Sequence, residues 1–246
     1  MKKLLLSAFV ICLAGTSIAQ ESPLWMRHCA LSPDGTTIAF TYKGDIYTVP
    51  STGGRATQIT TNPAFDTEPV WSPDSKQIAF ASDRMGSLDV FVVSSEGGAP
   101  QRLTTHSGSE KPVAYKDNKH ILFTANIAPS AEDAGFPSGQ FQQVYEVAVT
   151  GGRPAMFSSM PMECISINKE GVMLYQDKKG YEDYWRKHQV SPIAHDIWTY
   201  TPGKKPVYQK QTTFGGEDRE PVWSPDGKSF YYLSEEKGSF NIFQRD

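Results

Sequence analysis

The 246-residue sequence predicts an all-β fold, namely a β-propeller of four-stranded blades with about five blades present. Three observations support this prediction. A Ser-Pro-Asp turn recurs along the chain, an apolar alternation follows each copy, and paired glycines occur in three of the repeats. Repeats of about 40 residues that each hold four short strands are typical of propeller blades. The 20 glycines and 17 prolines suit a fold with many turns.

The repeated turn begins at Ser32, Ser72 and Ser224. In a type I turn proline presets φ at the second position, aspartate is tolerated at the third, and glycine suits the fourth. Two degenerate copies lie between these three, so the acidic marker falls at positions 34, 74, 117, 170 and 226, with spacings of 40, 43, 53 and 56 residues. The paired glycines, which supply the positive φ values of a tight hairpin, stand at 53–54, 97–98 and 151–152.

These markers divide the chain into blades at roughly 28–60, 66–104, 110–157, 161–213 and 217–246. In the second blade we expect strands at 70–72, 77–82, 89–94 and 101–104. Phe243 matches Phe91 of the second blade, and only three residues follow it, so the fifth blade is expected to lack its fourth strand. Either residues 22–27 supply that strand, or the chain is the front part of a longer polypeptide. A β-sandwich is the alternative fold, and the matched offsets of the turns argue against it.

The N-terminus predicts export. Lys2 and Lys3 precede an apolar run at 4–13, and Ser17 and Ala19 provide small residues ahead of a cleavage site. We therefore expect residues 1–19 to be a secretory signal peptide, residues 20–246 to form the propeller, and the protein to be periplasmic or secreted. The alternative is a membrane anchor, for which the apolar run is short.

Composition and motifs exclude several kinds of function. A net charge of −3 indicates neither nucleic acid nor an anionic membrane as a partner. The sequence has no Gly-x-Ser-x-Gly, no His-Glu-x-x-His, no Cys-x-x-Cys and no phosphate-binding glycine loop. We therefore expect no catalytic residue, no metal site and no cofactor in this chain. The two histidines of one insertion, His188 and His195, are expected to be polar loop residues rather than a metal pair.

Two stretches are more specific than the repeat. The first runs from Gly-Tyr-Glu-Asp-Tyr-Trp-Arg-Lys-His at 180–188 through Asp-Ile-Trp at 196–198. The second, at 214–227, reads Phe-Gly-Gly-Glu-Asp-Arg-Glu-Pro-Val-Trp-Ser-Pro-Asp-Gly. With Pro-Leu-Trp-Met-Arg at 23–27, they resemble the N-terminal propeller of bacterial tricorn-type serine peptidases, from about residue 23 to the end of the chain. The resemblance implies a six-bladed first propeller, a second propeller, a PDZ domain and a C-terminal serine peptidase core, with propellers that filter and guide peptides.

The region that holds the family's catalytic residues is absent from this sequence. We therefore expect a non-catalytic portion of an exported peptidase, whose partners are peptides or unfolded polypeptide and the peptidase domains of the same parent protein. Two alternatives share the blade motifs. One is a stand-alone periplasmic interaction scaffold resembling the Tol-system propeller, and the other is the propeller of a prolyl-oligopeptidase-like enzyme.

Two groups of residues are candidates for substrate contact. The first is an aromatic and basic run in the insertion, which suits a peptide's carboxylate or aromatic side chains: Tyr184, Trp185, Arg186 and Lys187. The second is a set of acids just before innermost strands, where they would favour cationic or N-terminal groups at the channel mouth: Glu68, Glu110, Glu163 and Glu220. The alternatives are a loop anchored by its aromatic residues and ordinary solvated acids.

Two pairs of residues test the assignment of blades. Cys29 and Cys164 fall in the innermost strands of the first and fourth blades, which the channel should separate, so we expect two free and mostly buried thiols. Trp71 and Trp223 occupy equivalent positions and are expected in the core between blades.

Overall fold

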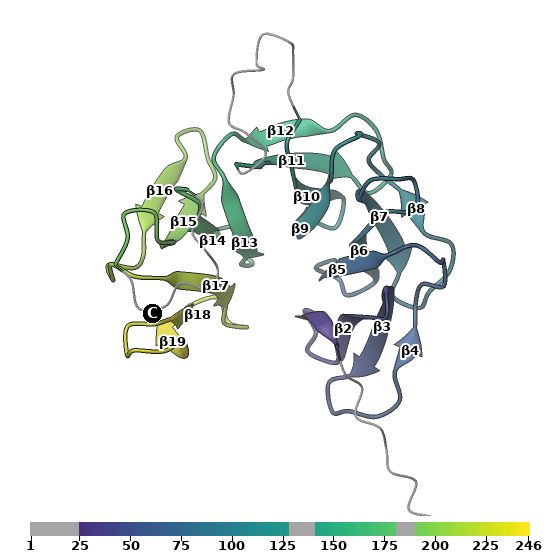
Figure 1. Cartoon of the computed structure of the whole chain (residues 1–246), viewed down its shortest axis with the longest axis horizontal. Coiled ribbons are helices and arrows are strands. Elements are labelled where there is room, and N and C mark those ends of the chain that lie inside the picture. The colour runs from purple at the N-terminus through teal and green to yellow at the C-terminus, as the bar shows by residue number, and fades with distance from the viewer. Residues whose placement is uncertain (1–24, 128–140, 181–189) are drawn as a thin grey trace, which may run out of the picture.

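The computed structural model describes residues 25–127, 141–180 and 190–246, and every helix or strand in these ranges is a β-strand. The strands form five antiparallel sheets, arranged as blades in an arc around a common centre (Figure 1). The predicted β-propeller is therefore confirmed. In the ranges described, we find no helical candidate for a membrane span. The expected signal peptide at 1–19 lies outside them.

Each blade is built from consecutive strands of the chain. The first blade contains β1 (Arg27–Leu31), β2 (Thr37–Tyr42), β3 (Asp45–Pro50) and β4 (Thr57–Gln58). The second contains β5 (Asp66–Trp71), β6 (Gln77–Ser82), β7 (Asp89–Ser94) and β8 (Gln101–Arg102). The third contains β9 (Lys111–Asp117), β10 (His120–Ala125), β11 (Gln143–Ala148) and β12 (Ala155–Ser158). The fourth contains β13 (Met162–Ile167), β14 (Met173–Asp177), β15 (Ile197–Thr201) and β16 (Val207–Lys210), and the fifth contains β17 (Asp218–Trp223), β18 (Phe230–Ser234) and β19 (Asn241–Arg245).

In every blade the strands pair in chain order. Four sheets have four strands and the fifth has three, as the length of the last repeat predicted. The first strands of successive blades, β1, β5, β9, β13 and β17, contact one another in that order and line the centre of the arc. In the second blade, β6 and β7 match the predicted strands, whereas β5 begins four residues earlier than expected.

The Ser-Pro-Asp turns close through local hydrogen bonds. The Ser32 hydroxyl donates to Asp34 Oδ1 over 2.6 Å, and the N–H of Gly35, at φ +74°, donates to the Ser32 carbonyl over 2.8 Å. The same serine-to-aspartate bond spans 2.7 Å in the second copy and 2.6 Å in the fifth blade. These contacts join residues two or three apart, so a short sequence motif is sufficient to specify them.

The core consists of apolar clusters between neighbouring blades, and each cluster joins two of them. Between the first and second blades, Ala39 and Ile46 pack against Trp71, whose indole N–H donates to the Ala30 carbonyl over 2.9 Å. Trp223 packs between the fourth and fifth blades and donates to the Val172 carbonyl over 3.2 Å. The prediction that both tryptophans lie in the inter-blade core is confirmed.

Both insertions begin at one end of the central channel. Thr124, near the end of β10, pairs with Lys111 at the start of β9, and Asp177, at the end of β14, pairs with Met162 at the start of β13. The connections β10–β11 and β14–β15 therefore leave the blades where the innermost strands begin. We call this end of the channel the mouth.

Candidate functional site

A β-bulge interrupts the innermost strands at equivalent positions. The register of β1, β5, β13 and β17 against the second strand of each blade shifts there. In each bulge one non-glycine residue has a positive φ: His28 (51°), Glu68 (56°), Cys164 (51°) and Glu220 (51°). Such backbone conformations cost on the order of 1–3 kcal/mol each and mark candidate functional sites. In β9 the equivalent residue is Pro112, whose ring does not allow a positive φ.

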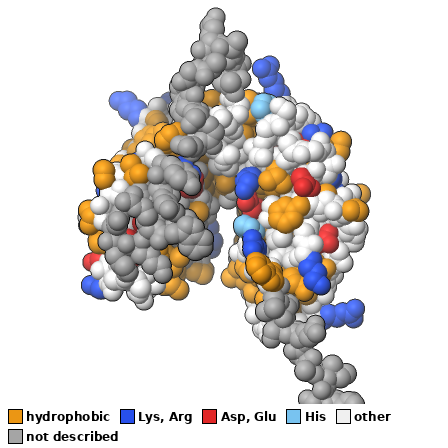
Figure 2. Space-filling model, in the orientation of Figure 1, with side chains coloured by type: hydrophobic (Ala, Val, Ile, Leu, Met, Phe, Trp, Pro, Cys, Tyr) orange, Lys and Arg blue, Asp and Glu red, His pale blue; other side chains and the backbone are white. Residues whose placement is uncertain are grey.

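Next to these bulges lies a cavity of about 510 Å³, formed by the innermost strands of the first four blades. Its wall includes four of the five equivalent bulge positions, His28, Glu68, Pro112 and Cys164. Figure 2 shows that this side of the molecule is hollowed at its centre, with acidic and basic side chains at the edge of the hollow. The cavity at the mouth is therefore the candidate binding site.

The carboxylates of this cavity are paired with lysines. Lys111 Nζ lies 2.7 Å from Glu68 Oε1, and Lys178 Nζ lies 2.6 Å from Glu163 Oε1. The Gln176 amide also donates to Glu163 Oε2 over 3.1 Å. The wall thus presents both charges side by side, which suits a ligand that carries both donors and acceptors.

The structure places the four predicted acids in three different positions. Glu68 and Glu220 are bulge residues, and Glu163 directly precedes the bulge residue of its strand. Glu68 and Glu163 line the cavity, whereas Glu110 is fully buried and accepts a hydrogen bond from the backbone of His106. The expectation that Glu110 faces the channel mouth is therefore corrected, and burial raises its pKa. A count of residues before a strand does not reveal how a bulge turns each side chain.

The aromatic and basic candidates Tyr184, Trp185, Arg186 and Lys187 lie outside the described residues. The described parts of their insertion meet the cavity wall at Lys178.

Cys29 and Cys164 are unpaired, as expected, but both are exposed, so the prediction of mostly buried thiols is wrong. Cys29 and Cys164 lie at bulges, which turn them away from the inter-blade core, and both line the same cavity. Desolvation at the cavity wall, with the nearby carboxylates of Glu220, Glu163 and Glu68, raises the pKa of Cys164 to about 12. Its thiol therefore stays protonated near neutral pH and is a poor nucleophile.

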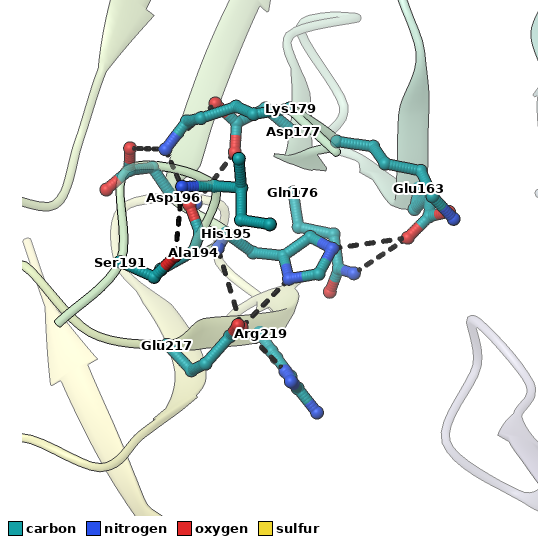
Figure 3. A network of polar contacts seen from close by, with 12 residues as sticks. Glu163, Gln176, Asp177, Lys179, Ser191, Ala194, His195, Asp196, Glu217 and Arg219 are labelled. Carbon is teal, nitrogen blue, oxygen red and sulfur yellow. Dashed lines mark hydrogen bonds and ion pairs between the residues drawn. The ribbon is translucent and has the colours of Figure 1, made fainter. Parts of the chain in front are cut away.

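The sequence predicts only a polar loop residue at His195, and it does not predict that this side chain lies between two carboxylates (Figure 3). Its Nδ1 is 2.8 Å from Glu217 Oε2, and its Nε2 is 3.8 Å from Glu163 Oε2. The guanidinium of Arg219 donates to the same oxygen of Glu217 over 2.8 Å. Burial by itself would raise the pKa of Glu217, but the hydrogen bonds from His195 and Arg219 hold it at about 2.

A signal for this contact was present in the sequence, because His195 belongs to the insertion and Glu217 and Arg219 belong to the second family-specific stretch. Their contact joins the two stretches that carried the resemblance. Among the residues that the structure describes, no group of three or more histidine, cysteine or acidic side chains is arranged to hold a metal ion.

Comparison with known proteins agrees with this architecture. The sequence profile of the family described as "Tricorn protease N-terminal beta propeller domain" matches residues 23–246. Tricorn protease homolog 1 of Streptomyces coelicolor is 39% identical over 213 residues, which cover 86% of this chain and 19% of that protein. The chain thus spans about a fifth of the length of this relative.

Two solved structures share the fold. The crystal structure of the tricorn protease superposes with a TM-score of 0.71 at 17% identity and covers 92% of this chain, which corresponds to 22% of that protein. The putative TolB from Agrobacterium tumefaciens superposes with a TM-score of 0.69 at 15% identity, and the match covers 92% of this chain and 78% of that one. The family profile extends over both specific stretches and all five blades, and the chain therefore belongs to the family of tricorn protease N-terminal β-propeller domains.

Proposed function

We propose that this propeller is the non-catalytic entrance domain of an exported tricorn-type serine peptidase. It binds extended peptides or unfolded polypeptide at the mouth and guides them toward peptidase domains of the same protein. The observation that supports this most is the cavity of about 510 Å³ at the mouth, where both insertions begin. Binding sites on rigid scaffolds are commonly built from such loops.

The chemistry of the wall supports a peptide ligand. Glu68 and Glu163 offer carboxylate acceptors, whereas Lys111 and Lys178 offer ammonium donors within 2.7 Å of them. A peptide presents N–H donors and carbonyl acceptors along its whole length, so it can exchange hydrogen bonds with both kinds of group. Because the lysines partly neutralise the acids, the wall is suited to peptides of varied sequence.

The proposal is tested by the fluorescence anisotropy of a labelled, unfolded casein peptide titrated with the chain. The double variant Glu68→Gln with Glu163→Gln should weaken binding roughly thirtyfold, since each of the two lost charged hydrogen bonds is worth about 1 kcal/mol in a solvated site. Glu96→Gln is the control, because Glu96 lies in the turn after β7, away from the cavity. Equal binding by all three proteins would reject the mouth as the peptide site, and peptide cleavage by the pure chain would reject the non-catalytic assignment.

A second candidate is a stand-alone scaffold that binds other proteins in the periplasm. It is favoured by the TolB structure, of which this chain spans 78%. An immunoblot of cell fractions with an antibody against the propeller separates the two. A species several times larger than 27.3 kDa supports the peptidase, and a species near that mass supports the scaffold. Release of either species by osmotic shock supports export, and retention in the cytoplasm contradicts it.

A further inference from the structure

One ring nitrogen of His195, Nδ1, is within hydrogen-bond distance of a carboxylate, whereas the other, Nε2, faces a second carboxylate at a longer distance. The His195 side chain is 12% exposed. His195 precedes β15 in the sequence, and its ring lies between Glu217 of the fifth blade and Glu163 of the cavity wall. Glu217 is 4% exposed, and its pKa of about 2 keeps it ionised at any physiological pH. An ionised carboxylate accepts hydrogen bonds and donates none.

This arrangement determines the tautomer of His195. Because Glu217 is an acceptor only, the 2.8 Å contact requires the proton to be on Nδ1. In the neutral ring, Nε2 then carries a lone pair and faces Glu163 Oε2, which is also an acceptor. Two acceptors form no hydrogen bond, and the observed separation of 3.8 Å is longer than one.

Protonation of the ring changes this contact. It places a donor on Nε2 opposite Glu163, and a charged N–H and a carboxylate prefer a separation of about 2.7–2.9 Å. The contact would shorten by about 1 Å. Glu163 is also bound by Lys178 over 2.6 Å and by Gln176 over 3.1 Å, so a pull toward His195 competes with both bonds.

We propose that His195 is the residue that couples pH to the charge and position of Glu163 on the cavity wall. While the His195 ring is neutral, Glu163 is paired with Lys178 and faces the cavity, and once the ring is protonated, His195 binds Glu163 and adds a positive charge behind the wall. The affinity of the mouth for cationic peptide ends then falls with falling pH. This consequence for binding rests on the proposed function, whereas the contact of His195 with Glu163 does not.

Several charged groups from neighbouring elements surround His195. Glu163 is in β13, Asp177 ends β14, Lys178 and Lys179 follow it, Asp196 adjoins His195, and Glu217 and Arg219 belong to the start of the fifth blade. Most of these are engaged with one another: Lys179 with Asp177 and Asp196, and Arg219 with Glu217. Glu163 is the acceptor that Nε2 faces.

The first test is ¹⁵N-edited NMR of the histidine-labelled chain, with the His195 signal assigned by its loss in His195→Asn. At the alkaline end of a pH series the neutral ring should be the Nδ1–H tautomer, and at the acid end both nitrogens should carry protons. An Nε2–H tautomer of the neutral ring would overturn the proposal, because Nε2 would already donate to Glu163.

The second test measures coupling between the two residues by urea unfolding of the single and double variants. His195→Asn is suitable because its amide can still donate to Glu217, and Glu163→Gln removes the charge without changing the shape. At about pH 5 the coupling should change the unfolding equilibrium constant about two- to fivefold, and at about pH 8 it should vanish. Equal coupling at the two pH values would reject the switch.

The third test repeats the anisotropy titration with a labelled oligolysine peptide at about pH 5 and about pH 8. The wild-type chain should bind several-fold more weakly at the lower pH, and His195→Asn should lose most of this difference. If the first two tests succeed and oligolysine does not bind at either pH, the switch stands and the proposed function fails. If oligolysine binds with the same pH dependence in His195→Asn, the coupling to binding is wrong.

Discussion

Arg84 and Asp66 form a buried ion pair in the second blade, in which one guanidinium nitrogen lies 2.9 Å from each carboxylate oxygen of Asp66. The fifth blade has an equivalent aspartate but no equivalent arginine. Asp218 lies opposite Ser234 in the strand register, as Asp66 lies opposite Ser82, but the residue two positions after the serine is Glu236 rather than an arginine. Asp218 is 1% exposed, and burial, with the charges of Asp196 and Glu236, raises its pKa.

The two aspartates should therefore respond differently to the same substitution. Asp66→Asn should destabilise the chain by about 2–4 kcal/mol, because it leaves Arg84 largely buried without its anion. Asp218→Asn should be neutral or stabilising at about pH 8, because it removes a buried charge that has no cation beside it among the described residues. Urea unfolding of both variants tests this, and an equal loss of stability would show that Asp218 has a counter-ion.

A cation introduced beside Asp218 should stabilise the fifth blade. Glu236→Arg places a guanidinium where Arg84 stands in the second blade and should add about 1 kcal/mol to the free energy of unfolding. Glu236→Gln is the control, because it removes repulsion without adding attraction and should give a smaller gain. Melting temperatures across pH provide the measurement. If both variants gain equally, no ion pair has formed.

Stability should depend on pH in opposite directions at Asp218 and Glu217. The pKa of Asp218 is raised in the folded state. Its contribution to the free energy of unfolding is therefore complete below the ordinary pKa of 3.8 and is lost as pH rises through the raised pKa. The pKa of Glu217 is lowered from 4.5 to about 2. Its contribution to the free energy of unfolding is therefore present above pH 4.5 and is lost as pH falls toward 2.

Glu217→Gln isolates the second of these contributions. At about pH 7 it should remove stability on the order of 3 kcal/mol, and the loss should shrink as pH approaches 2. Urea unfolding at several pH values measures it. A loss that is the same at about pH 7 and about pH 3 would show that the carboxylate charge is not what His195 and Arg219 stabilise.

The fourth position of the repeated turn is a glycine in the first blade and a serine in the second, so each residue can be substituted by the other. Ser75 has φ +59° at the position where Gly35 has φ +74°, so the serine is strained and the glycine is not. Ser75→Gly should stabilise the chain by about 0.5–1 kcal/mol, and Gly35→Ser should destabilise it by a similar amount. Thermal unfolding of the two variants measures both changes. A loss in Ser75→Gly would mean that the 3.3 Å hydrogen bond from the Asp34 N–H to Ser75 Oγ outweighs the strain.

The sequence by itself determined the repeats, the turns and the number of blades. Ser32 and Asp34 bond to each other across two residues, and the glycines at 53–54 adopt positive φ within one hairpin. Such contacts are local, so a few neighbouring residues suffice to specify them. The three-stranded last sheet followed from counting residues after the last turn, and Trp71 and Trp223 followed from the periodicity of the repeat.

Only the tertiary structure decided which side chains face the channel. The bulges turn Cys29 and Cys164 into the cavity, and they separate Glu68 from Glu110, although both acids lie near the start of an innermost strand. A bulge adds a residue against a partner strand, so its effect on direction is visible only once the register is known. The contact of His195 with Glu217 and Glu163 likewise joins three segments distant in sequence, and packing of the fourth blade against the fifth brings them together.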